Sequence, residues 1–156
     1  MNSINFRAPL AWLGLAAALA ACENPVTPAD HEEPEGLVLL DGATEVLRVI
    51  GRGAVGVASD TLRVAAGAQT PELTVSFIDE HGDALTIDEE NTLAVVSDSP
   101  ATATWQGSAA GVYAGRVSGL AAGTTTLRFQ LYHGSVETGH VDAEFRVPVT
   151  VTAVQP

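Results

Sequence analysis

Two histidines and two acids lie close together towards the C-terminal end of the chain. His133 and His140 flank a short polar stretch that contains Glu137, and Asp142 follows two residues later. Imidazole nitrogens and carboxylates are ligands that Zn²⁺, Cu²⁺ and Ni²⁺ use in proteins. If the segments on either side pair as a β-hairpin, both imidazoles lie at one loop. The pattern predicts either a divalent-metal site or an exposed loop with ordinary histidines.

A second group of potential ligands lies in the middle of the chain. Within twelve residues there are six acids and one histidine: Asp79, Glu80, His81, Asp83, Asp88, Glu89 and Glu90. Ca²⁺ binds about six to eight oxygen atoms, which clustered carboxylates could supply. The spacing is not that of an EF-hand loop. A solvated acidic loop without metal is therefore the competing interpretation.

Catalytic motifs are not evident. The sequence has no nucleophile elbow of the hydrolase type and no loop of the type that binds nucleotide phosphates. His31-Glu32-Glu33 begins like a zinc-protease helix, but Pro34 blocks the helix and the second histidine is missing. We expect a protein that is not an enzyme, with a divalent metal ion as its one conceivable cofactor.

Charge and composition exclude further classes. The 156 residues include 19 acids and 7 bases, all arginine, for a net charge of −12. Such a chain has no basic face to displace counterions from phosphates, so no nucleic acid is expected as a partner. Apolar residues make up 46% and charged residues 17%, which favours a folded domain over a disordered acidic chain. The single cysteine excludes an intramolecular disulfide.

Residues 1–21 are typical of a secretory signal peptide. After Arg7 the stretch from Ala8 to Ala21 is apolar over 14 residues. As a helix it would extend about 21 Å, which is less than the ~30 Å of hydrocarbon that a membrane span crosses. The segment therefore fits a signal peptide better than a membrane span or a buried helix.

The signal ends in Leu19-Ala20-Ala21-Cys22, which resembles the lipobox of bacterial lipoproteins. The resemblance implies that the Cys22 thiol carries diacylglycerol and becomes the mature N-terminus, so that lipid joins the protein to a membrane. A buried structural cysteine is the alternative. Glu23 stands where an aspartate would resemble the inner-membrane retention signal of enteric bacteria. We expect a lipid-anchored cell-envelope protein at the outer membrane, on its periplasmic or surface face.

Residues 22–36 have the composition of a linker. Three prolines and five acids follow Cys22 with almost nothing apolar to bury. This composition predicts a disordered, solvated tether. A sorting signal or a weak metal chelator is the alternative interpretation.

Residues 37–154 show the pattern of short strands. Apolar and polar residues alternate over 73–77, 127–132 and 145–152, as expected for strands with one buried face. Gly, Asp and Pro clusters separate the runs. We predict an all-β fold, an antiparallel sandwich of about seven to nine strands.

Three details sharpen this prediction. Asp41-Gly42 between two apolar runs predicts an N-terminal hairpin. Pro148 has no N–H to donate, so its strand should be an edge there or contain a bulge. Trp105 is expected to pack between the sheets.

Three stretches, taken in order, resemble the group 2 bacterial immunoglobulin-like domains of intimins and invasins. They are Asp60–Phe77, the Ser-Asp turn within 96–104, and the Gly-Leu-x-x-Gly-Thr hairpin within 117–127. The resemblance covers about 58–152 and implies an Ig-like sandwich. The acidic segment at 79–92 and the hairpin before residue 51 depart from the family pattern.

Together these features predict a non-catalytic, lipid-anchored Ig-like module of the cell envelope. It would serve binding, adhesion or structural interaction, with an envelope protein or a glycan as partner. The alternative is a periplasmic lipoprotein that binds Ca²⁺ at 79–90, or Zn²⁺ or Cu²⁺ at His133 and His140.

Overall fold

Ten strands and one turn of 3-10 helix make up the computed structural model, which describes residues 33–109 and 112–154. The predicted signal peptide, Cys22 and the tether as far as residue 32 lie outside the described residues. The elements are β1 Gly36–Asp41, β2 Thr44–Ile50, η1 Gly53–Val55, β3 Val57–Ala58, β4 Leu62–Ala65, β5 Leu73–Ile78, β6 Asn91–Ser97, β7 Ala103–Gly107, β8 Ala114–Gly119, β9 Gly123–His133 and β10 His140–Thr152.

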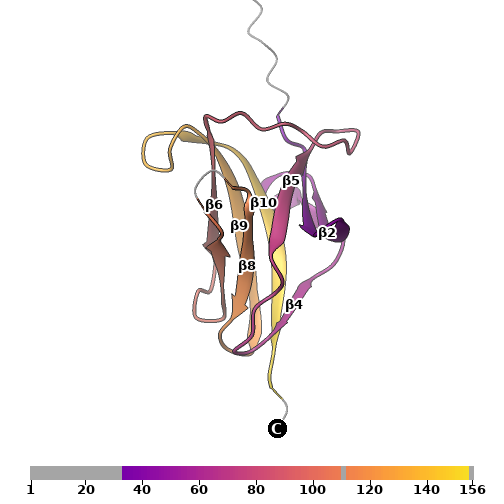
Figure 1. Cartoon of the computed structure of the whole chain (residues 1–156), viewed down its shortest axis with the longest axis vertical. Coiled ribbons are helices and arrows are strands. Elements are labelled where there is room, and N and C mark those ends of the chain that lie inside the picture. Colours follow the sequence, from indigo (N-terminus) through magenta and orange to yellow (C-terminus); the bar gives the residue numbers. More distant parts are fainter. Residues whose placement is uncertain (1–32, 110–111, 155–156) are drawn as a thin grey trace, which may run out of the picture. The chain divides into compact units, whose positions relative to one another are not determined.

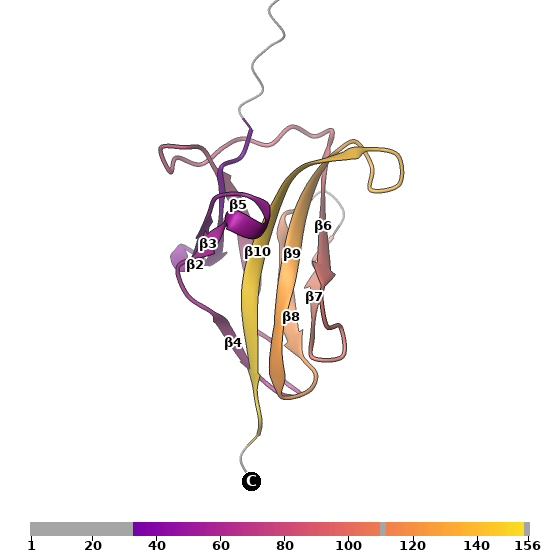
Figure 2. The same cartoon turned by 180° about the vertical axis from the view of Figure 1, so that it is seen from behind.

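The strands form two sheets that face each other (Figures 1 and 2). The six-stranded sheet has the order β3-β2-β1-β5-β8-β7, and the four-stranded sheet has the order β4-β10-β9-β6. All pairings are antiparallel except that of β4 with β10. β5, β8 and β7 in one sheet and β6, β9 and β10 in the other follow the strand order of an Ig-like sandwich. The predicted fold class is confirmed.

The strand count exceeds the predicted seven to nine because the two-residue β3 adds to the edge of the predicted N-terminal hairpin. β1 pairs with β5, β2 pairs with β1, and the two-residue β3 adds to β2. The predicted turn at Asp41-Gly42 joins β1 to β2. The ladder between β10 and β4 begins at Val149, so Pro148 is paired on one side only, as predicted.

Inward-facing residues of both sheets fill one core. Its largest fully buried side chains include Phe77, Phe129 and Phe145. Trp105 lies partly buried with its ring 5.1 Å from that of Phe129, between the sheets as predicted. All core residues fall between Leu37 and Val151. The unit that begins at Glu32 therefore contains all of these core residues.

The tether prediction extends too far towards the sandwich. Pro34 is buried, and the Glu35 backbone bonds to Ile78 and Gly51. The Arg52 guanidinium binds Glu33 at 2.6 Å and also binds Glu35. Sequence reasoning treated these acids as solvated because their cationic partner lies 17 to 19 residues further along the chain.

Candidate functional site

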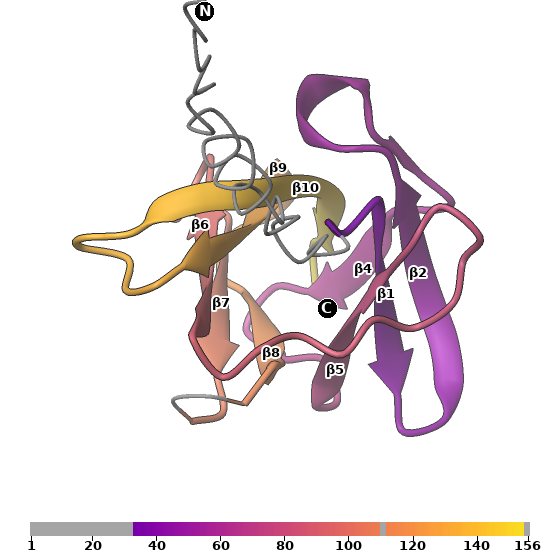
Figure 3. The ribbon, with the colours of Figure 1, turned by 90° about the horizontal axis from the view of Figure 1, so that it is seen from above.

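The acidic segment crosses one end of the sandwich. It leaves β5, turns at 79–83 and runs across to β6 in the other sheet (Figure 3). The Leu85 N–H donates to the Phe77 carbonyl, and Ile87 packs against the core. The acids at the two ends of this segment consequently lie next to strands of different sheets.

Asp79 organises the turn at the first end. Its Oδ1 accepts the backbone N–H groups of His81 and Asp83, at 2.8 and 2.9 Å. The hydrogen bond from the Asp83 N–H lowers the pKa of Asp79 most, and the one from the His81 N–H lowers it less. Desolvation opposes this effect but does not cancel it. His81 lies 3.7 Å from Asp79 Oδ2 and 3.9 Å from Glu80 Oε1. The Asp79 carboxylate is therefore already engaged by its own loop.

His133 and His140 face each other across the β9–β10 ladder. They are paired positions, and their ring centroids lie 5.6 Å apart. Because side chains alternate along a strand, His133 shares the inward face with Leu131 and Phe129. The pair thus lies where the core ends, on the rim of the four-stranded sheet. The predicted hairpin brings the two imidazoles together as expected.

A β-bulge sets the position of Asp142. Val141 pairs with Tyr132 and Ala143 with Leu131, which leaves Asp142 as an extra residue. Its Oδ1 lies 2.9 Å from His140 Nε2, and its Oδ2 accepts the Asn91 side-chain amide at 3.3 Å. The carboxylate is held between β10 and β6.

Glu90 connects the acidic segment to this rim. Its carboxylate lies 3.9 Å from His133 Nε2, and its carbonyl accepts the Gly134 N–H. Asn91, the next residue, pairs with His133. Glu90, His133, His140 and Asp142 therefore lie together where β6 and β10 begin and β9 ends, and we call this group the histidine rim.

The remaining predicted ligands lie elsewhere. Glu137 is exposed in the hairpin loop, Glu89 lies beside another groove, and Asp79 to Asp83 belong to the turn after β5. Among residues 33–109 and 112–154, no three His, Cys, Asp or Glu side chains are grouped closely enough to hold one metal ion.

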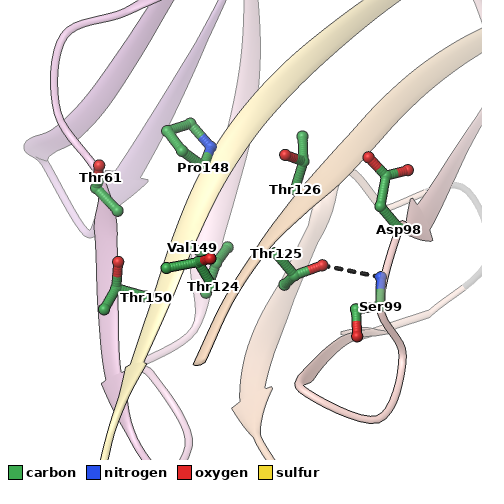
Figure 4. A pocket seen from close by; sticks show the side chains of 9 residues that line it. All are labelled: Thr61, Asp98, Ser99, Thr124, Thr125, Thr126, Pro148, Val149 and Thr150. Atoms are coloured by element: carbon green, nitrogen blue, oxygen red, sulfur yellow. Dashed lines mark hydrogen bonds between the residues drawn. The ribbon is translucent and has the colours of Figure 1, made fainter. Parts of the chain in front are cut away.

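A hydroxyl-lined hollow opens on the outer face of the four-stranded sheet (Figure 4). Its volume is about 420 Å³, and Asp98, Ser99 and five threonines contribute to its wall: Thr61, Thr124, Thr125, Thr126 and Thr150. The Thr125 hydroxyl accepts the Ser99 N–H at 2.9 Å, which orders that side. Hydroxyls both donate and accept hydrogen bonds, so this surface suits a polar partner.

Charges surround the same face of the sheet. Arg128 contacts Asp98 at 2.9 Å and Glu144 at 3.7 Å, and Arg146 contacts Glu144 at 3.1 Å. Burial raises the pKa of Glu144, but the hydrogen bonds from Gln130 and Arg146 and the arginine charges outweigh it and lower the pKa overall. These ion pairs fix the positions of the charged side chains on the outer face of the sheet.

A groove of about 290 Å³ lies where β6 approaches β7 and β8. Trp105, Tyr113 and Leu93 contribute to its wall. The Tyr113 hydroxyl donates to the Asn91 carbonyl at 3.0 Å, and desolvation, with the nearby Asp88 charge, raises the pKa of Tyr113. This hydrogen bond joins Tyr113, which lies next to β8, to β6 in the other sheet.

Sequence reasoning passed over one glycine spacing. Gly51, Gly53 and Gly56 match the fingerprint of dinucleotide-binding loops, which requires a strand before it and a helix after it. In this fold the residues join β2 to β3, and the only helical residues within 33–109 and 112–154 are the three of η1. Arg52 is bound to Glu33 and Glu35. The context that would make the spacing a nucleotide site is missing from this part of the described chain.

Sequence reasoning also missed Glu90 and Asn91 as neighbours of the histidine pair. The contact from Glu90 to His133 spans 43 residues of chain. The apolar residues at 93–96 lie soon after Glu90, but no residue pattern specifies that a strand there pairs with β9.

Comparison with known proteins yields partial structural likenesses. No protein-family model matches the chain, and neither does any curated protein. Domains 5–6 of the S-layer protein SbsC are 27% identical over 69% of this chain and 46% of theirs, with a TM-score of 0.46. Domains 4 and 5 of SbsC are 22% identical over 75% of each chain, with a TM-score of 0.44. The chain thus spans less than half of the first structure.

The described part of the chain contains no helix with the length and apolar character needed to cross a membrane.

Proposed function

We propose that this chain is a non-catalytic, lipid-anchored Ig-like module that holds a partner at the cell envelope. The lipobox-like Leu19 to Cys22 supports the anchor, and the acidic linker after it supports a body held away from the membrane. About ten linker residues in extended form reach roughly 31 Å. The partner is an envelope protein or a glycan.

The observation that carries the proposal is the hydroxyl-lined hollow on a rigid sheet. Thr124, Thr126 and Thr150 come from adjacent strands β9 and β10, so the ladder fixes their spacing. A surface of fixed hydroxyls binds by hydrogen bonding, and a rigid scaffold reduces the entropy lost on association.

Mass spectrometry of the protein from native membranes tests the anchor. We expect an N-terminal acylated Cys22, and a Cys22→Ser variant should retain the signal and lack the lipid. An unmodified Met1 together with a free Cys22 thiol would contradict the anchor.

Photo-crosslinking in cells tests the holding surface. A photoreactive residue at Thr124, which is exposed at the hollow, should give one discrete adduct. The same residue at Thr44, exposed on the other sheet, is the matched control. Equal adducts at both positions, or none at Thr124, would argue against the hollow as the binding surface.

A further inference from the structure

The histidine rim has a geometry that can hold a metal ion between two imidazoles. His133 and His140 are directly paired across an antiparallel ladder, where paired Cβ atoms lie about 4.5–5.5 Å apart. The strand register thus fixes the distance between the two histidines. If both lay in a loop, no register would fix that distance. Both side chains are exposed, at 49% and 75%, so an ion can reach them from solvent.

The ring separation agrees with the size of a shared metal ion. An imidazole nitrogen binds Zn²⁺ at about 2.0–2.1 Å, which places the ion about 3 Å from the ring centre. Two rings that share one tetrahedral ion therefore have centres about 5 Å apart. The observed 5.6 Å lies close to this value, so binding requires a small adjustment of two exposed side chains.

Asp142 prepares one of the two ligands. Its Oδ1 lies 2.9 Å from His140 Nε2, which favours the proton on that nitrogen and leaves the lone pair on Nδ1. Metal-binding histidines are commonly oriented by a carboxylate in this way. Asn91 in turn holds the other oxygen of Asp142. The β-bulge therefore positions a carboxylate behind the imidazole, which makes Asp142 a positioning residue.

We propose that His133 and His140 form an open two-imidazole site for a divalent transition-metal ion of the kind that imidazole prefers: Cu²⁺, Ni²⁺ or Zn²⁺. No third ligand among the described residues is grouped with them, so water completes the coordination. Glu90, 79% exposed and 3.9 Å from His133 Nε2, adds negative charge beside the ion. Imidazole ligands favour these ions over Ca²⁺, which takes oxygen ligands. The proposal does not depend on the envelope function.

Calorimetric titration of residues 23–156 with Cu²⁺ tests the site, because this chain contains the whole core and lacks the Cys22 thiol. We expect one equivalent of Cu²⁺ to bind, Zn²⁺ to bind more weakly in line with the usual order of metal affinities, and Ca²⁺ to give no heat. Electron paramagnetic resonance of the Cu²⁺ complex should show coupling to two nitrogens.

Single substitutions identify the ligands. His133→Asn and His140→Asn should each weaken Cu²⁺ binding at least about tenfold, and Asp142→Asn should weaken it about tenfold through His140 alone. His81→Asn is the matched control, because His81 is also exposed and near carboxylates but has no paired histidine. Amide spectra of each variant confirm the fold. Cu²⁺ affinity unchanged in both rim variants, or lost equally in His81→Asn, would overturn the proposal, as would Ca²⁺ binding of equal strength.

Discussion

The acidic turn at 79–83 and the histidine rim lie at the same end of the sandwich (Figure 1), yet they use their charged groups differently. In the turn, Asp79 accepts two backbone N–H groups and so stabilises its own loop. At the rim, His133 and His140 pair across a ladder and present their rings side by side.

The difference shows that strand register concentrates ligands more effectively than density of acids in the sequence. Six acids in twelve residues are spread along a segment that crosses between sheets. Two histidines seven positions apart, one at each end of the same loop, are brought together because their strands are hydrogen-bonded neighbours. A loop rich in carboxylates satisfies its backbone first, whereas a ladder leaves its terminal side chains available.

The largest expected effect comes from the core beneath the rim. Leu131 is 1% exposed and lies one inward position below His133. Leu131→Ala should lower the free energy of unfolding by about 2–5 kcal/mol, because it leaves a cavity. Urea unfolding measures this loss. Val136→Ala, in the exposed hairpin loop, should stay within about 0.5 kcal/mol of the parent. A loss of equal size in both would contradict the argument that burial in the core, and not the exposed loop, stabilises this end of the sheet.

A second test compares two glycines, one in each region. A Cβ on Gly139 would lie 2.2 Å from the His133 carbonyl oxygen, so the hairpin backbone would have to move. Gly139→Ala should cost about 1–3 kcal/mol and also weaken Cu²⁺ binding. Gly82 has φ +86°, and a Cβ there would make only an ordinary contact with Arg48 Nη1 at 3.6 Å, so Gly82→Ala should cost about 1–2 kcal/mol from backbone strain. It should leave Cu²⁺ binding unchanged, and a change there would show that the two regions are coupled.

The pH dependence of stability tests the role of Asp79. Its lowered pKa means that the ionised carboxylate stabilises the fold at pH values above its unfolded pKa, near 3.8. That stabilisation is lost as the pH falls through the folded pKa, below 3.8. In a plot of the urea unfolding midpoint against pH, Asp79→Asn should therefore reduce the fall of the midpoint at acid pH. Asp83→Asn, in the same turn, keeps its N–H donor to Asp79 and should follow the parent curve. Identical curves for the parent and Asp79→Asn would remove this role.

The smallest effect is expected at acids that neither accept backbone N–H groups as Asp79 does nor belong to the histidine rim. Glu137→Gln and Glu80→Gln change exposed side chains in the hairpin and in the turn. Both should stay within about 0.5 kcal/mol in urea unfolding, and neither should alter Cu²⁺ affinity more than about twofold. A tenfold loss in Glu137→Gln would make it a third ligand and would require a different geometry for the rim.

Much of the fold could be predicted from periodicity and turns. Asp41-Gly42 indicated the first hairpin, and Pro148 indicated a strand paired on one side. The two-residue β3 could not be predicted, because so short a strand has no period of its own. The docking of Pro34 to Gly36 was also missed, because it depends on Arg52 and Ile78, which are distant in the sequence.

The histidine pair could be predicted as a hairpin, but its surroundings could not. Glu90 and Asn91 approach through the β6–β9 pairing, which nothing local in the sequence specifies. The bulge that changes the direction of Asp142 adds one residue to the alternation of apolar and polar residues and has no other sequence signal. Long-range pairing and bulges are decided by the whole sheet, so they became visible in the structure alone.

Cu²⁺-induced line broadening in the amide and histidine NMR spectra of residues 23–156 compares the two regions most directly. A paramagnetic ion broadens the signals nearest to it. Substoichiometric Cu²⁺ should first erase signals of Glu90, His133, His140 and Asp142, while those of Asp79 to Asp83 persist. Broadening that begins at the acidic turn, or that spreads evenly over all exposed acids, would contradict the claim that strand register, and not the density of carboxylates, determines where a cation binds.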